Sequence, residues 1–209
     1  MIVFLFHWFV KITGWLAYWI VFCPKYYYED KKRQSRRIRG SAIVISNHAS
    51  VWDVAILLFA FPLRTLRCAV AELMYQKNAL MSLFLRLFGA IRVDRTSRDL
   101  SFLSTCERIL SGGGVVEIYP EARIPQKGEE RPLAFKPSAV LLALRSGAPV
   151  IPVCHRSPYF GKGRTKVMIG APIDVRELYD DTLSEKENII KITEGIRRRI
   201  IEFETELQK

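Results

Sequence analysis

The chain has few cysteines, and no two of them lie close together in the sequence. Cys23, Cys68, Cys106 and Cys154 form no C-x-x-C motif, which argues against a zinc site and a thioredoxin-like redox site. Cys68 and Cys154 lie in apolar runs, so we expect them to be buried free thiols in a reducing compartment. No other spacing typical of metal ligands is present, and we predict that the protein binds no metal.

Acidic side chains are scarce relative to basic ones. The 209 residues include 21 Asp and Glu against 32 Lys and Arg, a formal net charge of +11. Such a surplus favours anionic partners, which include nucleic acids, anionic lipid headgroups, and phosphorylated substrates or carriers. Apolar residues at 49% and charged residues at 25% exclude a disordered tail and a protein with many membrane spans.

Charge is almost absent from Met1–Cys23, where Lys11 carries the only full charge. As a helix this stretch would be about 34 Å long, near the hydrocarbon thickness of a bilayer. It has no basic start and no small-residue cleavage site, which argues against a signal peptide. Lys11 and Gly14 interrupt it, and its tryptophans and tyrosines suit the headgroup boundary. We therefore expect a monotopic anchor, as a broken helix or helical hairpin; a single span and a soluble core helix are the alternatives.

A basic cluster follows the apolar stretch, Lys31-Lys32-Arg33-Gln34-Ser35-Arg36-Arg37-Ile38-Arg39. Beside an apolar segment, such a cluster marks the cytoplasmic face of a membrane and attracts anionic lipid. A solvated surface is the alternative. We expect no nucleic-acid partner, because interleaved aromatics and a recognisable reading motif are absent. Residues 1–39 are therefore predicted to be a membrane anchor with a basic juxtamembrane segment, and residues 40–209 a separate domain.

Strand and helix patterns alternate after Gly40. Short apolar runs bounded by turn residues predict buried strands at Ala42–Ile45, Leu66–Val70, Ala90–Val93, Val115–Tyr119, Val150–Cys154 and Lys166–Ile169. Helical patterns cover Asp53–Phe61, Gln76–Phe88, Arg98–Leu110, Pro137–Arg145 and a last helix that opens with the capping-box spacing of Ser184 and Glu187. This alternation predicts an α/β fold with a mostly parallel central sheet flanked by helices, preceded by the membrane-associated helical segment.

The first predicted strand leads into a segment that contains His48 and Asp53. On one regular helix these residues would lie about 140° apart and could not meet. If His48 lies in the turn and Asp53 opens the next helix, the carboxylate can fold back onto the imidazole and stay ionised at the helix N-terminus. Such a pair suits general-base activation of an alcohol. A capping aspartate beside a structural histidine is the alternative.

Four sequence blocks resemble those of the glycerolipid acyltransferases, the PlsC-like lysophosphatidic acid acyltransferase family. Asn47-His48-Ala49-Ser50-Val51-Trp52-Asp53 resembles its N-H-x-x-x-x-D block. Gly89–Arg95, Tyr119–Arg123 and Val150–Val153 resemble the other three in the right order, and Phe135–Ala139 resembles the lead into the preceding helix. The resemblance covers most of the chain from about Gly40 to Pro172. It implies that His48 is the catalytic base and Asp53 its orienting acid.

The resemblance also implies that arginines hold the phosphate of the acceptor, which suits the planar guanidinium fork. Arg95 is the preferred ligand. Arg92 is a second candidate, with a structural ion pair to Asp94 on the same strand face as the alternative. The third block departs from the usual F-P-E-G-T-R, because a single residue separates Glu121 from Arg123. Both are nevertheless expected to contact substrate.

The activity that the resemblance implies is transfer of a fatty acyl group from acyl-CoA or acyl carrier protein (acyl-ACP) to the hydroxyl of 1-acyl-glycerol-3-phosphate. The product is phosphatidic acid, and no separate cofactor is expected. Ser50 is the one nearby candidate nucleophile, but no G-x-S-x-G surrounds it. The alternatives are acylation of glycerol 3-phosphate or of another lyso-lipid, and a non-catalytic basic protein of the membrane surface.

Overall fold

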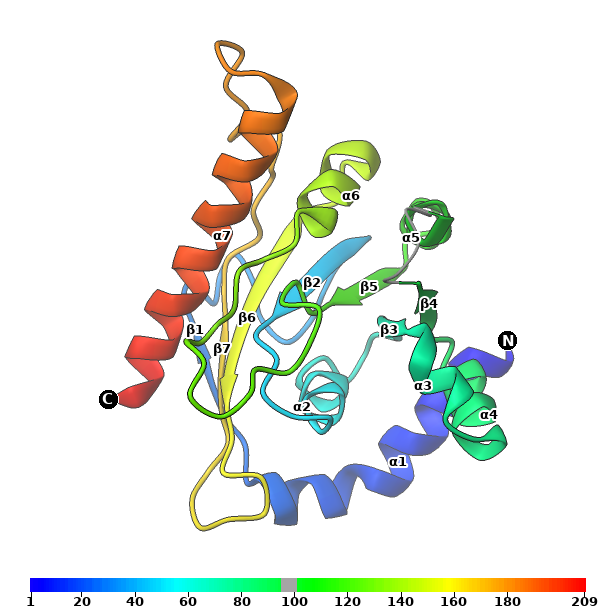
Figure 1. Ribbon diagram of the computed structural model, residues 1–209. Coiled ribbons are helices and arrows are strands. Elements are labelled where there is room, and N and C mark those ends of the chain that lie inside the picture. Colours follow the sequence, from blue (N-terminus) through cyan, green and yellow to red (C-terminus); the bar gives the residue numbers. More distant parts are fainter. Residues whose placement is uncertain (95–100) are drawn as a thin grey trace.

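A computed structural model of the chain describes residues 1–94 and 101–209. Within these residues, one sheet has the strand order β1-β7-β6-β2-β5-β3-β4 (Figure 1). The strands are β1 Lys25–Tyr28, β2 Ala42–Ser46, β3 Leu66–Ala71, β4 Ile91–Val93, β5 Val115–Ile118, β6 Val150–Arg156 and β7 Lys166–Ile169. Neighbouring strands are parallel except for β6 and β7. The predicted mostly parallel sheet is confirmed, and six of its strands coincide with predicted ones.

Strand β1 was not expected from the sequence. It pairs in parallel with β7, with Lys25 opposite Lys166. Because β7 is antiparallel to β6, β1 and β7 run opposite to the other five strands. The division of the chain between residues 39 and 40 stays a prediction, but β1, which lies before it, is part of the sheet.

Helices cover both faces of the sheet (Figure 1). They are α1 Ile2–Phe22, α2 Asp53–Ala60, α3 Glu72–Gln76, α4 Ala79–Leu87, α5 Ser101–Ser111, α6 Ser138–Ser146 and α7 Glu185–Gln208. Strand β2 contributes to both cores, since Ile43 and Ile45 pack with α5, α6 and α7, whereas Ala42 and Val44 pack with α1 and α2. Burial of both faces explains why this strand is an unbroken apolar run.

The helix expected over residues 76–88 is α4, which begins later, at Ala79, and Gln76 instead ends the preceding helix α3. Asn78 has an extended backbone, with φ −166° and ψ 165°, and its side chain accepts a hydrogen bond from the backbone N of Met81. It therefore caps α4 and separates it from α3. The first residues of the helix expected at Arg98–Leu110 lie outside the described ranges, and the remainder coincides with α5.

Local signals placed two other helices well. Gly147 ends α6 in the left-handed region, at φ 68°, as expected for a glycine beyond the last turn. Ser184 and Glu187 form a complete capping box at the start of α7. From there α7 buries a stripe of apolar side chains at helical spacing, namely Ile192, Ile196, Ile200, Phe203 and Leu207.

Helix α1 is continuous, so the expected broken helix or hairpin was wrong. By length and composition, it is the one helix in the described residues that could cross a membrane. Its large outward side chains are each at least 36% exposed, namely Phe4, Leu5, Phe9, Ile12, Trp15, Leu16, Trp19 and Ile20. With only 17% of its most apolar window buried, α1 is not a core helix.

Two polar side chains of α1, His7 and Lys11, face the domain. Lys11 Nζ donates hydrogen bonds to the carbonyls of Phe61 and Pro62, each at 3.0 Å, and His7 Nε2 lies 2.9 Å from the carbonyl of Phe88. A Cβ on Gly14 would lie 3.2 Å from the ring of Phe59, so this glycine allows α1 to approach α2 closely. The two residues that interrupt the apolar stretch, Lys11 and Gly14, are therefore contacts with the domain.

Candidate active site

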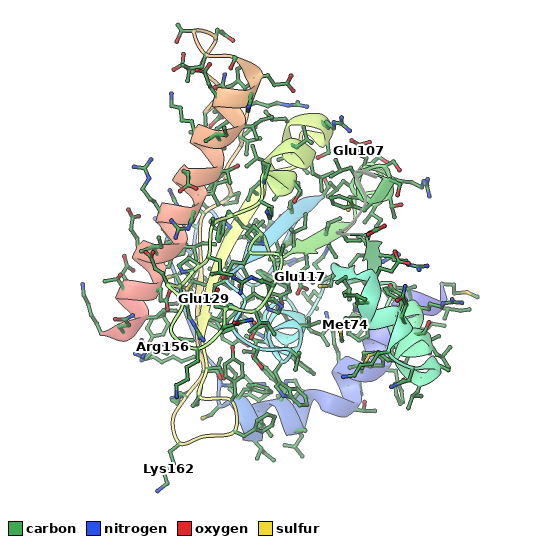
Figure 2. All side chains as sticks on the ribbon, in the orientation of Figure 1. Met74, Glu107, Glu117, Glu129, Arg156 and Lys162 are labelled. Carbon is green, nitrogen blue, oxygen red and sulfur yellow. The ribbon has the colours of Figure 1, made fainter. Side chains whose placement is uncertain are left out.

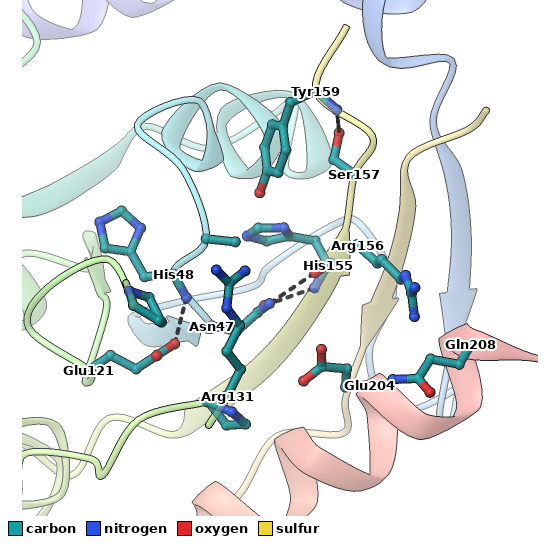
Figure 3. Close-up of a pocket in the computed structure, with 13 residues that line it drawn as sticks. Asn47, His48, Glu121, Arg131, His155, Arg156, Ser157, Tyr159, Glu204 and Gln208 are labelled. Atoms are coloured by element: carbon teal, nitrogen blue, oxygen red, sulfur yellow. Dashed lines mark hydrogen bonds between the residues drawn. The ribbon is translucent and has the colours of Figure 1, made fainter. Parts of the chain in front are cut away.

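The candidate site lies at the carboxyl ends of β2, β5 and β6, which are parallel neighbours. Ligands of open α/β sheets bind at this edge. The chain turns out of β2 at His48 and out of β5 at Glu121, and both line a cavity of about 280 Å³ together with His155 of β6 (Figure 3). Three segments distant in the sequence thus converge on one recess.

His48 and Asp53 meet in the turn between β2 and α2. His48 Nδ1 lies 2.9 Å from Asp53 Oδ2, and Asp53 is the first residue of α2. The same oxygen accepts hydrogen bonds from the backbone N of Ala49 at 2.7 Å and of Ser50 at 2.9 Å. The turn and the helix start together give the geometry that a histidine and carboxylate five residues apart require.

The second oxygen of Asp53 has partners from the end of β6 and the loop after it. The Tyr159 hydroxyl donates to Asp53 Oδ1 at 2.5 Å, and His155 Nε2 lies 3.6 Å from the same atom. Burial alone would raise the pKa of Asp53, but His155 and the hydrogen bonds from His48, Tyr159 and Ser50 outweigh it and lower that pKa below its usual value. Asp53 is therefore a buried, ionised carboxylate that can hold the His48 ring.

Glu121 fixes the turn that carries His48. Its Oε1 accepts a hydrogen bond from the His48 backbone N at 2.7 Å, and its Oε2 accepts one from the Leu133 backbone N at 2.8 Å. The His48 ring also stacks on Tyr119, with 4.3 Å between ring centroids. Because both carboxylate oxygens are occupied, Glu121 has a positioning role here, and its contact with substrate stays a prediction.

Comparison with known proteins shows the family of this chain. The family model described as Acyltransferase matches residues 25–156. The chain belongs to the acyltransferase family. It is 30% identical over 138 residues to the 1-acyl-sn-glycerol-3-phosphate acyltransferase of Bacillus subtilis, covering 64% of this chain and 66% of that protein. It is 28% identical over 144 residues to the human 1-acyl-sn-glycerol-3-phosphate acyltransferase beta, covering 66% of this chain and 51% of that protein.

The fold is also that of a solved acyltransferase. The crystal structure of PlsC from Thermotoga maritima, the 1-acyl-sn-glycerophosphate acyltransferase, superposes with a TM-score of 0.63 at 22% identity. The match covers 93% of this chain and 78% of that one. The chain spans between half and two thirds of the length of the two curated relatives, so the comparisons establish its family and its fold.

Of the arginines in the family blocks, Arg92 and Arg123 do not line the cavity. Arg92 pairs with Glu72, rather than with its strand neighbour. Arg123 forms a bidentate pair with Glu129, with both N–O distances 2.6 Å. Arg95 lies outside the described residues. Phosphate binding by these three arginines stays a prediction, and for Arg92 and Arg123 it would require an acidic partner to give way.

The shortened third block has a structural consequence at Ala122. Its φ is 61°, in the left-handed region that L-residues with a side chain rarely adopt. The family pattern has glycine directly after the glutamate, and glycine adopts this φ without strain. Ala122 therefore occupies a backbone conformation that would suit glycine better.

Several residues of the site gave no signal in the sequence. Tyr159 contacts Asp53 across 106 residues, and His155 is a lone histidine in an apolar strand. Asn47, although part of the first block, has an unexpected role, since its side chain bonds both the backbone N and the carbonyl of His155, at 2.9 Å each. Among the described residues, no three His, Cys, Asp or Glu side chains gather to hold a metal ion.

Proposed function

We propose that this chain transfers a fatty acyl group from an acyl thioester, acyl-CoA or acyl-ACP, to the free hydroxyl of 1-acyl-glycerol-3-phosphate, making phosphatidic acid. The observation that carries this proposal is His48 in the cavity wall, with Nδ1 held by the buried carboxylate of Asp53. The names of the similar proteins support the choice of acceptor.

The dyad supports a general-base mechanism. With Nδ1–H donated to Asp53, His48 Nε2 carries the lone pair, and it has no hydrogen-bond partner among the described residues. It accepts the proton of the acceptor hydroxyl as that oxygen attacks the thioester carbonyl. The C–S bond then breaks, and the proton passes to the leaving thiolate, giving an ester and a free thiol. Asp53 stabilises the transient imidazolium, as in other His–Asp pairs.

Direct attack needs no acyl-enzyme. A thioester is already activated, and the only nearby hydroxyl that the sequence singled out is that of Ser50. Its Oγ accepts a hydrogen bond from the Trp52 backbone N at 3.3 Å, within the turn. A backbone N–H is a donor, so this contact does not activate the hydroxyl by taking its proton. The proposed chemistry therefore depends on the dyad alone.

The exposed apolar surface supports membrane binding from one side. The outward face of α1 and the exposed rings of Trp52 and Phe160, whose centroids are 5.1 Å apart, offer apolar contact to a bilayer. Since Lys11 and His7 bond to the domain, α1 is held against it, which favours a monotopic arrangement over a span. Exposed residues of the basic cluster, such as Lys32 and Arg37, suit the anionic cytoplasmic leaflet.

The test is release of free thiol by the purified protein. With acyl-CoA as donor, lysophosphatidic acid should release thiol in proportion to phosphatidic acid formed. Parallel reactions with glycerol 3-phosphate and with lyso-lipids of other headgroups identify the acceptor, and acyl-ACP replaces acyl-CoA in a second series. Binding to anionic vesicles without thiol release for any pair would contradict the proposal and would indicate a non-catalytic membrane-surface protein.

A further inference from the structure

Two arginines outside the family blocks line the cavity beside His48. Arg131 comes from the loop between β5 and α6, and Arg156 is the last residue of β6. Neither guanidinium has an ion-pair partner within 4.0 Å among residues 1–94 and 101–209. Figure 3 shows Arg131 pointing into the space between His48 and His155, so its charge faces the place where a substrate would meet the base.

The arginines of the family blocks are placed differently. Arg92 and Arg123 are both paired, with Glu72 and Glu129, and neither lines the cavity. Among the described arginines, Arg131 and Arg156 are therefore the two that a phosphate beside His48 could reach without breaking an ion pair.

Two carboxylates share the cavity wall with these arginines. Glu121 already accepts two backbone hydrogen bonds, one on each carboxylate oxygen, and these stabilise its negative charge. Glu204 of α7 has no such partner; burial raises its pKa, while Arg156 and Arg131 act in the opposite direction. The two guanidinium groups can hold a phosphate monoester bidentately, and the negative charge of Glu204 beside them would repel that phosphate.

The volume of the cavity suits a headgroup rather than a whole lipid. The cavity has a volume of about 280 Å³. A glycerol phosphate fits such a space, whereas the acyl chains would have to lie outside it.

We infer that Arg131, assisted by Arg156, binds the phosphate monoester of the acceptor, and that Glu204 opposes this binding. The inference rests on the proposed function and specifies which residues recognise its substrate. It predicts two opposite effects: loss of Arg131 must weaken acceptor binding, and loss of Glu204 must strengthen it. The phosphates of coenzyme A offer the same chemistry, so the test has to separate acceptor from donor.

The experiment measures steady-state thiol release by the full-length protein, varying lysophosphatidic acid at saturating acyl-CoA and then the reverse. Arg131→Gln should raise the KM for lysophosphatidic acid about tenfold or more, at nearly unchanged kcat and donor KM. Arg131→Lys should have a KM for lysophosphatidic acid between those of Arg131→Gln and the wild type. Glu204→Gln should lower this KM. Arg108→Gln, on the exposed surface of α5, is the matched control.

A binding measurement removes the dependence on turnover. Calorimetric titration of the His48→Ala protein with hexanoyl-glycerol 3-phosphate, a soluble lysophosphatidic acid, should give a dissociation constant that Arg131→Gln weakens to the same degree. The inference is overturned if Arg131→Gln leaves the acceptor KM unchanged, if it raises only the donor KM, or if Arg123→Gln has the large effect instead. Failure of the proposed function is a separate result, because the wild type would then release no thiol.

Discussion

At the scale of single residues, Asp53 is the most heavily constrained group in the site. Its carboxylate is buried and accepts hydrogen bonds from one imidazole, two backbone N–H groups and one phenol. Each donor fixes the orientation of the carboxylate and thereby the ring plane of His48. The orientation of the His48 ring is thus set by Asp53 and by the donors around it.

Tyr159→Phe tests this constraint. A hydrogen bond to a charged group contributes about 1.5–3 kcal/mol, and the other donors to Asp53 remain, so we expect kcat to fall about tenfold with little change in the acceptor KM. Steady-state kinetics measures the split, and Tyr179→Phe, on an exposed loop, is the matched control. An unchanged kcat would show that Tyr159 plays no part in holding the dyad.

Ala122→Gly should stabilise the protein. Ala122 has φ 61°, and a non-glycine residue in this region costs about 1–2 kcal/mol. After the entropy that glycine adds to the unfolded chain, a net gain of about 0.5–1 kcal/mol in the free energy of unfolding is expected. Denaturant titration in detergent measures it. Ala134→Gly, at a position without positive φ, should stabilise nothing, and an equal gain there would refute the strain argument.

At the scale of elements, α1 combines two surfaces with opposite roles. Its inner side chains His7 and Lys11 bond to the end of α4 and to the turn after α2, and most of its outer side chains are large and apolar. The arrangement explains how a lysine can lie in the middle of an apolar helix without being exposed to lipid.

Phe9→Ser combined with Leu16→Ser should weaken membrane binding. The two side chains are 62% and 61% exposed on the outer face of α1, and transfer of each from water is worth roughly 1.5–3 kcal/mol. Cosedimentation with anionic vesicles should therefore show at least about a tenfold loss of affinity. Ile190→Ser, 52% exposed on α7, is the control. Undiminished binding of the double variant would exclude this face as the membrane contact.

Local signals account for the elements that could be predicted. The strands of the sheet interior were found because burial on both faces makes them apolar runs, and α7 because its capping box lies within four residues. Strand β1 was missed because its pairing with β7 spans more than a hundred residues and its tyrosines give no alternating pattern. The break between α3 and α4 depends on the backbone of Asn78, which the helical period over residues 76–88 concealed.

At the scale of the whole molecule, Glu117 links folding stability to pH. Figure 2 shows this residue near the centre of the molecule, and it is 1% exposed in β5. Burial raises its pKa from 4.5 to about 8. The folded protein therefore binds a proton that the unfolded chain releases, and the stabilisation present below pH 4.5 is lost as pH rises toward 8.

Glu117→Gln should flatten this dependence. In the wild type the free energy of unfolding is expected to fall between pH 5 and 8, by at most about 1.4 kcal/mol per pH unit from this group. The neutral amide removes the titration, while Glu202→Gln, on the exposed side of α7, keeps it. Denaturant unfolding across this range measures both, and parallel curves for wild type and Glu117→Gln would contradict the role given to Glu117.

As with the fold, only the parts of the candidate site that depend on neighbouring residues could be predicted from the sequence. The spacing of His48 and Asp53 is short enough for sequence to predict their meeting. Tyr159, His155 and Arg131 reach the site from other parts of the chain, through the order of strands in the sheet, and no motif marked them. The paired state of Arg123 with Glu129 likewise depends on a loop conformation that the motif does not encode.

The central claim is that the imidazole at position 48 performs the proton transfer. The most direct measurement compares thiol release from acyl-CoA by the wild type and by His48→Ala, with lysophosphatidic acid as acceptor and circular dichroism as the check on folding. The account predicts a folded variant whose rate falls by about 10²–10⁴, to background. A folded His48→Ala protein that transfers acyl groups at the wild-type rate would contradict it.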